Sequence, residues 1–168
     1  MSFWFRDHIL LLKQGVSLLE TLTDEIYLIK MHENSSSTGE HFRHIIEHYH
    51  LFIEGINDGY IDYDKRKRNL VLQSNRLCAI DSLQSLVLIF EEKEFPLGPL
   101  TISQNYDPNY PKPIVGSSVE RELMFLVSHT VHHFAIIGFL LKSFGIEVPQ
   151  SFGYSPATLF ANQYWKQN

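Results

Sequence analysis

Apolar residues recur every three or four positions in four stretches of the chain. This period is that of an amphipathic helix with one apolar face turned toward a core. The first stretch covers residues 3 to about 31, interrupted at Thr23, and the third covers residues 66 to about 92. The apolar rows of the second, third and fourth stretches are Phe42, Ile45, Tyr49, Phe52 and Ile56; Leu77, Ile80, Leu83, Val87 and Phe90; and Val119, Leu123, Leu126, Thr130, His133, Ile137, Leu140 and Phe144.

Serine, glycine and proline residues mark the ends of these helices. A serine followed three residues later by glutamate predicts a capping box at a helix start. A glycine just beyond an apolar row predicts a helix end, and a serine–proline pair predicts the start of a short final helix. The start signals are Ser37 with Glu40, Ser117 with Glu120, and Ser155 with Pro156, and the stop signals are Gly55, Gly59 and Gly145.

A proline-rich segment separates the third and fourth helices. Residues 95–118 hold five of the seven prolines in the chain, a density that does not allow a helix to continue. Leu100–Ser103 is expected to form a short strand, one arm of an irregular hairpin. A long ordered connection in a small helical protein is either a functional flap or a plain crossover, and the sequence leaves both open.

Length and composition fit one globular domain spanning residues 1–168. The chain has 168 residues, of which 44% are hydrophobic and 20% charged. Its net charge of -5 argues against a nucleic-acid-binding surface, which is normally basic. The basic run Lys65–Arg68 adjoins Asp62 and Asp64, so a solvated turn is favoured there over a phosphate site.

The sequence also bears on the compartment. Cys78 is the single cysteine, which excludes an internal disulfide and fits a reducing environment. Its apolar neighbours indicate a packed thiol rather than a nucleophile. The first residues lack the basic region and uninterrupted apolar run of a signal peptide, and we expect no stretch long and apolar enough to span a bilayer. These features predict a cytoplasmic protein without membrane or nucleic-acid partners.

Two groups of histidines fall at helical spacing. His129 and His133 are four residues apart in the fourth helix, so they lie on one face about one turn apart. His133 belongs to the apolar row, and His129 lies just beside it. In the second helix a histidine stripe runs beside the apolar row and faces partly inward. Its members are His41, His44 and His48.

Histidines in such positions need partners. A polar group buried without one costs roughly 2–7 kcal/mol by transfer estimates, whereas one metal ion satisfies several imidazole nitrogens at once. Two histidines four residues apart can hold an ion if a third ligand comes from elsewhere. On spacing alone, a metal site and a set of hydrogen-bonded core histidines remain equally open. His50, on the polar side of the second helix, is expected to be a surface residue.

Two stretches carry a resemblance to a known family. EHFRHIIEHYHLF in the second helix and RELMFLVSHTVHHFAIIGFLLKSFGIEVP in the fourth are together similar to the DinB/YfiT-like superfamily. The resemblance extends over essentially the whole chain in helix order. It implies an all-α four-helix bundle with a long crossover before the last long helix, and a divalent metal ion bound by three histidines.

The resemblance also implies which residues hold the ion. The ligands are His129 and His133, from the H-x-x-x-H pattern, and His44 from the second helix, with His48 as the alternate for the third position. A carboxylate two turns before His129 is expected to orient a ligand imidazole by a hydrogen bond. The supporting residues are Glu122, in that role, and His41 and His132.

Three neutral histidines and a water make an open site of the catalytic type. Such an ion lowers the pKa of bound water to about 7, or polarises a thiol or carbonyl. Members of the superfamily share the metal site but not the reaction. We expect a divalent-metal-dependent enzyme, a thiol-dependent transferase or a hydrolase, that acts on a small molecule such as a low-molecular-weight thiol. The alternative is a non-catalytic, stress-associated bundle in which the metal or the histidine network is structural.

Other details stay open at this point. The ion is expected to be zinc or nickel, with iron or manganese as the alternatives, and three imidazoles by themselves do not fix its identity. The sequence identifies no catalytic side chain beyond the ligands. Tyr49, Tyr106 and Tyr110 are candidates to line a pocket, although Tyr49 also fits the core. The apolar bundle and its aromatic tail are compatible with a homodimer.

Overall fold

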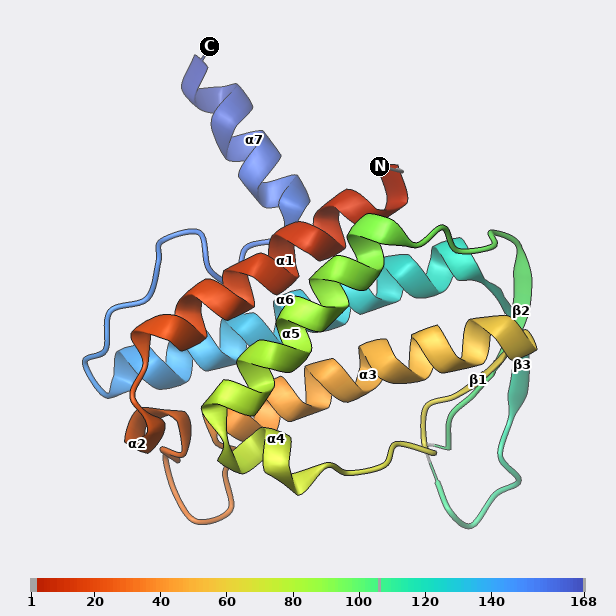
Figure 1. Ribbon diagram of the computed structural model, residues 1–168, viewed down its shortest axis with the longest axis horizontal. Helices are drawn as coiled ribbons and strands as arrows, with labels where there is room; N and C mark the ends of the chain where they lie inside the picture. Colours follow the sequence, from red (N-terminus) through yellow and green to blue (C-terminus); the bar gives the residue numbers. More distant parts are fainter. Residues whose placement is uncertain (1–2, 106, 168) are drawn as a thin grey trace.

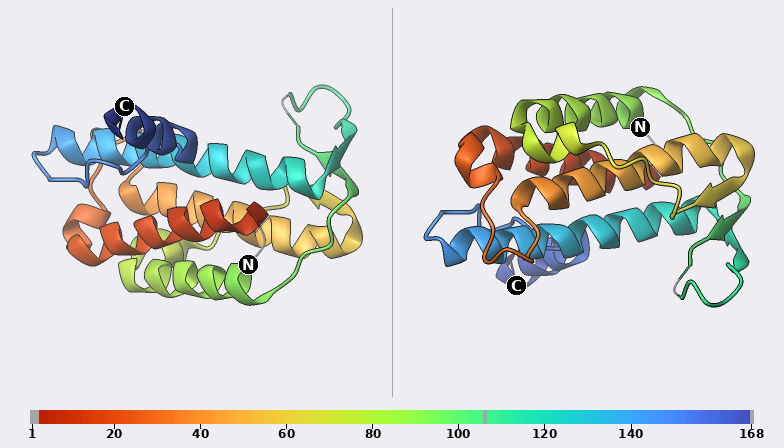
Figure 2. Two further views of the ribbon diagram at one scale, coloured as in Figure 1. Left: turned by 90° about the horizontal axis from the view of Figure 1, so that it is seen from above. Right: turned by 90° about the horizontal axis from the view of Figure 1, so that it is seen from below.

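The computed structural model describes residues 3–105 and 107–167. Four long helices pack against one another: α1 (Phe3–Thr21), α3 (Thr38–Asp58), α5 (Arg76–Glu92) and α6 (Val119–Ser143). Helices α1 and α3 each contact both α5 and α6, and a small sheet lies at one end of the group (Figure 1). Figure 2 shows the same grouping from above and below, with the last helix, α7 (Pro156–Gln167), outside it.

The sheet makes the expected all-α class too narrow. Its three strands are β1 (Tyr60–Asp62), β2 (Pro99–Ser103) and β3 (Ile114–Ser118), with β2 in the middle. The antiparallel pairing of β2 with β3 confirms the predicted strand and hairpin. Strand β1, expected to be a plain connection, pairs parallel with β2 instead. Three residues are too few for an alternating pattern to reveal a strand.

Helix α3 begins and ends where its local signals place it. The Ser37 side chain accepts a hydrogen bond from the Glu40 amide, and the Glu40 carboxylate accepts one from the Ser37 amide, which confirms the capping box. Gly59 ends the helix in the left-handed region with a φ of 65°. The whole predicted apolar row of this helix, from Phe42 to Ile56, is buried.

The first predicted helix is shorter than expected. Helix α1 ends at Thr21, and the chain forms a separate turn of helix, α2 (Asp24–Tyr27). The Thr23 side chain accepts a hydrogen bond from the Ile26 amide and so starts that turn. The Tyr27 hydroxyl, which is buried, donates to the Leu72 carbonyl at 2.5 Å and holds α2 against the following helices.

The third predicted helix is likewise divided. Residues 65–69 are not helical, and the chain then forms α4 (Leu70–Ser74) before α5 begins at Arg76. Asparagine side chains cap both starts, since Asn69 accepts from the Val71 amide and Asn75 from the Cys78 amide. The predicted helix extended across these caps because the spacing of apolar residues does not show where the backbone turns. Cys78 is a free, half-buried thiol packed against the core, as expected.

Helix α6 starts one residue later than predicted. Its cap is Ser118, which accepts from the Arg121 amide, whereas the hydroxyl of Ser117 donates to Glu122. His133 of the predicted row is half-buried, whereas Phe134, its neighbour outside the row, is fully buried. Gly145 takes a φ of 73° after the helix, as a stop signal should. The Ser155 hydroxyl accepts from the Thr158 amide at 3.1 Å, which confirms the start of α7.

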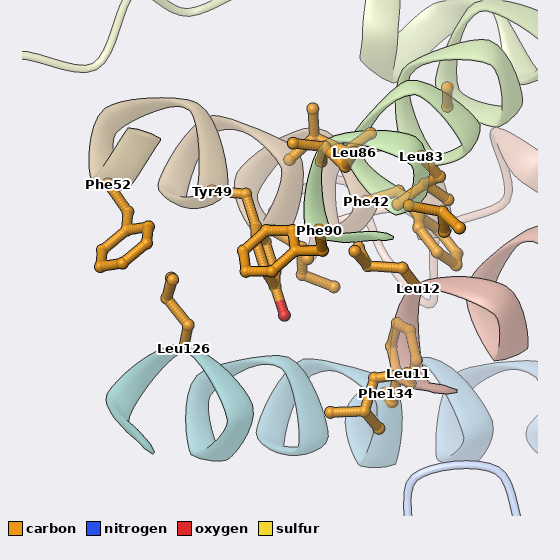
Figure 3. Close-up of a cluster of buried hydrophobic side chains, with 14 of the residues drawn as sticks. Leu11, Leu12, Phe42, Tyr49, Phe52, Leu83, Leu86, Phe90, Leu126 and Phe134 are labelled. Atoms are coloured by element: carbon orange, nitrogen blue, oxygen red, sulfur yellow. The ribbon is translucent and has the colours of Figure 1, made fainter. Parts of the chain in front are cut away.

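One core joins the four long helices. Aromatic and aliphatic side chains from α1, α3, α5 and α6 meet in its centre (Figure 3). This core fixes α3 and α6 side by side, which determines where the histidines on those helices lie. Its labelled members are Leu11, Leu12, Phe42, Tyr49, Phe52, Leu83, Leu86, Phe90, Leu126 and Phe134.

Helix α6 overturns the expectation about membrane-spanning stretches. It has 25 residues and a mean hydropathy of 1.6 over its most apolar window, enough by length and composition to cross a bilayer. In this fold its row of buried residues packs against α1 and α3, as a core helix of a globular protein does. The location of the protein in the cell remains a prediction from the sequence.

Candidate metal centre

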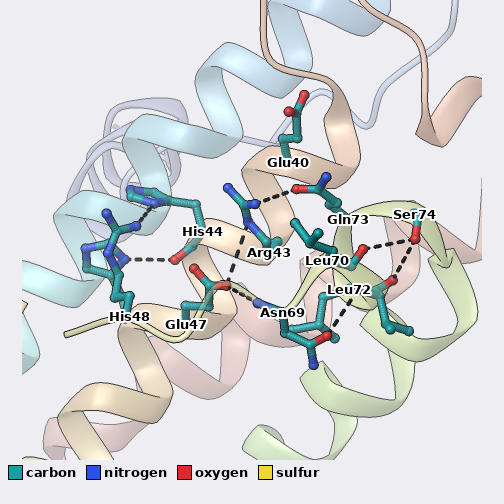
Figure 4. A network of polar contacts seen from close by, with 12 residues as sticks. Glu40, Arg43, His44, Glu47, His48, Asn69, Leu70, Leu72, Gln73 and Ser74 are labelled. Atoms are coloured by element: carbon teal, nitrogen blue, oxygen red, sulfur yellow. Dashed lines mark hydrogen bonds and ion pairs between the residues drawn. The ribbon is translucent and has the colours of Figure 1, made fainter. Parts of the chain in front are cut away.

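Two helices bring the histidine groups together. His44 and His48 lie on one face of α3, and His129 and His133 lie on the facing side of α6. Ligand nitrogens of His44, His48 and His129 all lie within 4.8 Å of one another, close enough to hold one metal ion. Among the described residues, no other group of three histidine, cysteine or carboxylate side chains has its ligand atoms this close together. Figure 4 shows the two members from α3, His44 and His48.

His133 adjoins this group. Its ring centroid lies 4.7 Å from that of His44 and 4.6 Å from that of His129. Its Nδ1 atom also forms a hydrogen bond of 3.0 Å with Nδ1 of His41. The four imidazoles named as possible ligands therefore lie together, with His48 beside His44. The assignment of His44, His129 and His133 as the ligands stays a prediction.

His48 and His129 each have an Nε2 atom that is available to bind a metal ion. Nδ1 of His48 donates to the carbonyl of His44 at 2.8 Å, so its Nε2 carries a lone pair. This is the usual arrangement of a metal-bound histidine, in which a second-shell acceptor fixes the tautomer. Nε2 of His129 is buried and has no hydrogen-bond partner in the described part of the chain. A buried polar atom without a partner is costly, and an ion would satisfy it.

The site environment keeps these imidazoles neutral. Burial is the largest cause of the lowered pKa of each of them, and neighbouring imidazoles and Arg66 lower it further. For His48 the hydrogen bond to the His44 carbonyl acts in the opposite direction. Neutral histidine is the form that binds metal. The pKa is lowered from 6.5 to about 2 for His44, about 4 for His48, and about 3 for His129 and His133.

The comparisons with known proteins agree with this arrangement. A family model described as "DinB family" matches residues 13–159. The chain belongs to the DinB family. No solved structure matches it. Membership in the DinB family and the close histidines are together compatible with a metal-binding site, and they leave the metal unidentified.

One curated relative shares part of the DinB chain. A protein named FK506-binding protein 5 from Rhizopus delemar is 32% identical over 102 residues. The alignment covers 59% of this chain but 26% of the fungal protein. Because the chain spans so small a part of that relative, the activity of the whole fungal protein is not transferred to it.

Arg66 enters the centre of this DinB site from outside the two helices. It follows β1, and its Nη1 contacts Nδ1 of His44, while its Nε donates to the carbonyl of Tyr63 at 3.2 Å. The basic run around it was expected to be a solvated turn. Lys65, Lys67 and Arg68 are indeed exposed, but Arg66 is half-buried and turned toward the histidines. Nothing in the run itself distinguishes it from its neighbours.

Tyr63 packs against His48, and Glu122 binds the Tyr63 hydroxyl. The Tyr63 ring stacks on that imidazole, with centroids 5.6 Å apart and planes at 24°. Its hydroxyl donates to Glu122 at 2.6 Å, and both burial and the carboxylate raise the pKa of Tyr63. Glu122 also accepts from Ser117 and Arg121. The expected direct hydrogen bond from Glu122 to a ligand imidazole is wrong, since Tyr63 stands between Glu122 and His48.

Of the remaining histidine and tyrosine candidates within the described residues, only His41 forms a hydrogen bond with a possible ligand. His41 supports His133 by the hydrogen bond already described, and His132 and His50 are exposed. Tyr49 is completely buried in the core, which is the second of its two expected roles. Tyr110 is 70% exposed, and Tyr106 lies outside the described residues.

Proposed function

We propose that this DinB family protein is a divalent-metal-dependent enzyme, a thiol-dependent transferase or hydrolase, with its ion held between α3 and α6. The observation that supports it best is the buried, unpartnered Nε2 of His129 beside the free Nε2 of His48. Zinc or nickel fits such neutral imidazoles best, and iron or manganese is the second choice. A small-molecule thiol substrate and a homodimer belong to the same proposal, on one domain with the four-helix-bundle fold of the family.

Two ligand sets compete within the proposal. His44 and His129 belong to both. The family pattern adds His133, and the interatomic distances add His48. Either set supplies three protein ligands and leaves a coordination position for water or substrate, whereas binding by all four imidazoles would close the site.

The surrounding side chains have defined tasks in this function. The ion supplies an activated water or a polarised thiol when it is bound. The His44 carbonyl fixes the tautomer of His48, and the Tyr63 ring fixes the plane of that imidazole. Glu122 holds Tyr63 in turn, at a position where its own carboxylate is completely buried. Arg66 provides a positive charge beside the imidazoles.

Metal analysis of single variants tests the proposal. We expect near-stoichiometric metal in protein purified without an affinity tag and a large loss in His129→Ala. Metal content in His48→Ala and His133→Ala identifies the third ligand. His50→Ala is the matched control on α3, because His50 is exposed and outside the cluster. Retention of full metal content by His129→Ala would falsify the proposed centre.

Activity is tested on the same proteins. Thiol-conjugation and ester substrates are screened with metal-loaded wild type, chelator-treated wild type and His129→Ala. Turnover in the first sample that is absent from the other two supports an enzyme. Equal turnover by a verified metal-free preparation rules out metal-dependent catalysis.

A structural site is the second candidate, and the presence of His48 beside His44 and His129 favours it, because it adds a fourth imidazole to the family's three. A closed site with four protein ligands stabilises the fold without binding a substrate. Cobalt replacement separates the two candidates, because an open cobalt site changes its visible spectrum when a small thiol is added. In a closed site the spectrum stays unchanged, while chelation still lowers the melting temperature.

A further inference from the structure

We propose that Arg66 binds a carboxylate group of the substrate, so that the site selects small molecules that carry a carboxylate beside their reacting group. This inference rests on the proposed function and goes further by naming the substrate class. It starts from the position of the Arg66 guanidinium beside the histidine cluster, which consists of His44, His48, His129 and His133. No other cationic side chain in the described part of the chain contacts a cluster imidazole.

The backbone around Arg66 is fixed at both ends. The Tyr63 amide donates to the Ser103 carbonyl at 3.0 Å, which continues the pairing of β1 with β2. The Asn69 amide donates to Glu47 at 2.9 Å, which ties the other end to α3. Between these points the Arg66 side chain turns inward and is only half exposed. The fold therefore directs the guanidinium at the cluster.

No carboxylate within residues 3–105 and 107–167 forms a direct ion pair with Arg66. Glu47 and Asp64 lie near enough to favour its charged form from a distance. Glu47 instead pairs with Arg43, and Asp64 with Lys112. A half-buried charge without a counter-ion is unfavourable. The imidazoles facing Arg66 are neutral and do not provide one.

An anion from outside would supply the missing charge. With a divalent ion bound, the centre carries the positive charges of the metal and of Arg66 against neutral ligands. A guanidinium presents its N–H groups as a planar fork that matches a carboxylate. A single guanidinium balances one negative charge, which suits a carboxylate better than a doubly charged phosphate.

If His44 is a metal ligand, it cannot bind the ion and accept a hydrogen bond from Arg66 at the same time. A neutral imidazole has one lone-pair nitrogen, and in the structure Nδ1 of His44 uses it to accept from Arg66. Coordination by His44 therefore releases the guanidinium, which stays within the site because its backbone is fixed.

Thiol probes on the cobalt-substituted protein test this inference. Mercaptoacetate and 3-mercaptopropionate carry a carboxylate, and 2-mercaptoethanol is the neutral reference. Dissociation constants come from the thiolate–cobalt absorption band in wild type, Arg66→Gln, Arg66→Lys and Arg68→Gln. Arg68 is an exposed arginine of the same segment, so its variant controls for overall charge. Metal content is measured for every protein.

The inference requires a specific pattern. Wild type and Arg68→Gln should bind the better carboxylate probe about tenfold or more tightly than the neutral one, as expected for a charge-assisted hydrogen bond. Arg66→Gln should lose that preference at unchanged cobalt content, and Arg66→Lys should keep part of it. The ratio between probes, compared across variants, removes differences in thiol acidity.

Other outcomes overturn it in distinguishable ways. A wild type that holds no metal refutes the proposed function and this inference together. Bound cobalt without a carboxylate preference, or with one that persists in Arg66→Gln, refutes only the inference. A spectrum that responds to no thiol also refutes it and indicates a closed structural site. Tighter metal binding by Arg66→Gln without any carboxylate preference would show that Arg66 only competes with the ion.

Discussion

His8 offers a test of burial that is independent of the metal. The imidazole is 1% exposed, and its ring stacks on Phe90 with centroids 5.0 Å apart. Nδ1 of His8 forms a hydrogen bond of 3.0 Å with the Tyr49 hydroxyl, which also accepts from Thr130 at 3.4 Å. Protonation of His8 would leave a charge in the core.

The stability effect follows from the pKa. Burial lowers the pKa of His8 from 6.5 to about 4. Between these values the unfolded chain binds a proton that the folded protein does not, so stability is complete above pH 6.5 and falls as the solution is acidified. At about 1.4 kcal/mol for each pH unit below the unfolded pKa, His8 accounts for a loss of about 2 kcal/mol between pH 7.5 and pH 5.

His8→Phe removes this proton while keeping a ring to stack on Phe90. Urea unfolding of wild type and variant at pH 7.5 and pH 5, with chelator present, gives the free energy of unfolding at each pH. The variant should lose about 2 kcal/mol less than wild type on acidification, since the other histidines contribute equally to both. Parallel losses in the two proteins would show that His8 is not held neutral by burial.

Two further predictions concern the packing around Gly39 and the hydrogen bond between Tyr63 and Glu122. Gly39→Ala places a Cβ 2.1 Å from the Gln73 carbonyl oxygen, so it should destabilise the fold by about 1–3 kcal/mol in urea unfolding. Gly138→Ala, whose nearest contact would be at 3.7 Å, is the control and should be neutral or stabilising; equal effects would contradict the packing argument. Tyr63→Phe removes a donor from the buried Glu122 and should cost about 1–3 kcal/mol. A calorimetric melting temperature equal to that of wild type would count against that hydrogen bond.

The helices that carry the histidines were predictable because their signals are local. A serine and a glutamate three residues apart start α3, and Gly59 ends it with a positive φ. The apolar row between them then determines which side faces the core. The histidine stripe follows from the same period, so the meeting of α3 and α6 could be expected once both rows were recognised.

The missed features depend on contacts between distant segments. Arg66 turns inward because β1 pairs with β2, and that pairing joins residues about 40 positions apart, such as Tyr60 and Thr101. The capping-box rule favours Ser117, which has Glu120 three residues later, but the hydroxyl of Ser117 donates to the buried Glu122 and Ser118 caps the helix instead. Periodicity contains neither kind of information.

The two anchors around Arg66 limit what kind of motion the site can have. Between the hydrogen bonds of the Tyr63 and Asn69 amides, the chain has little length in which to move as a loop. Asp64 is held as well, by Lys112 at 2.8 Å and by the Asn105 amide at 2.7 Å. Any change in the direction of the guanidinium is therefore a rotation about side-chain bonds. Such a rotation needs no displacement of the backbone, unlike the opening of a lid, so the arginine adds no moving loop to the entry of a ligand.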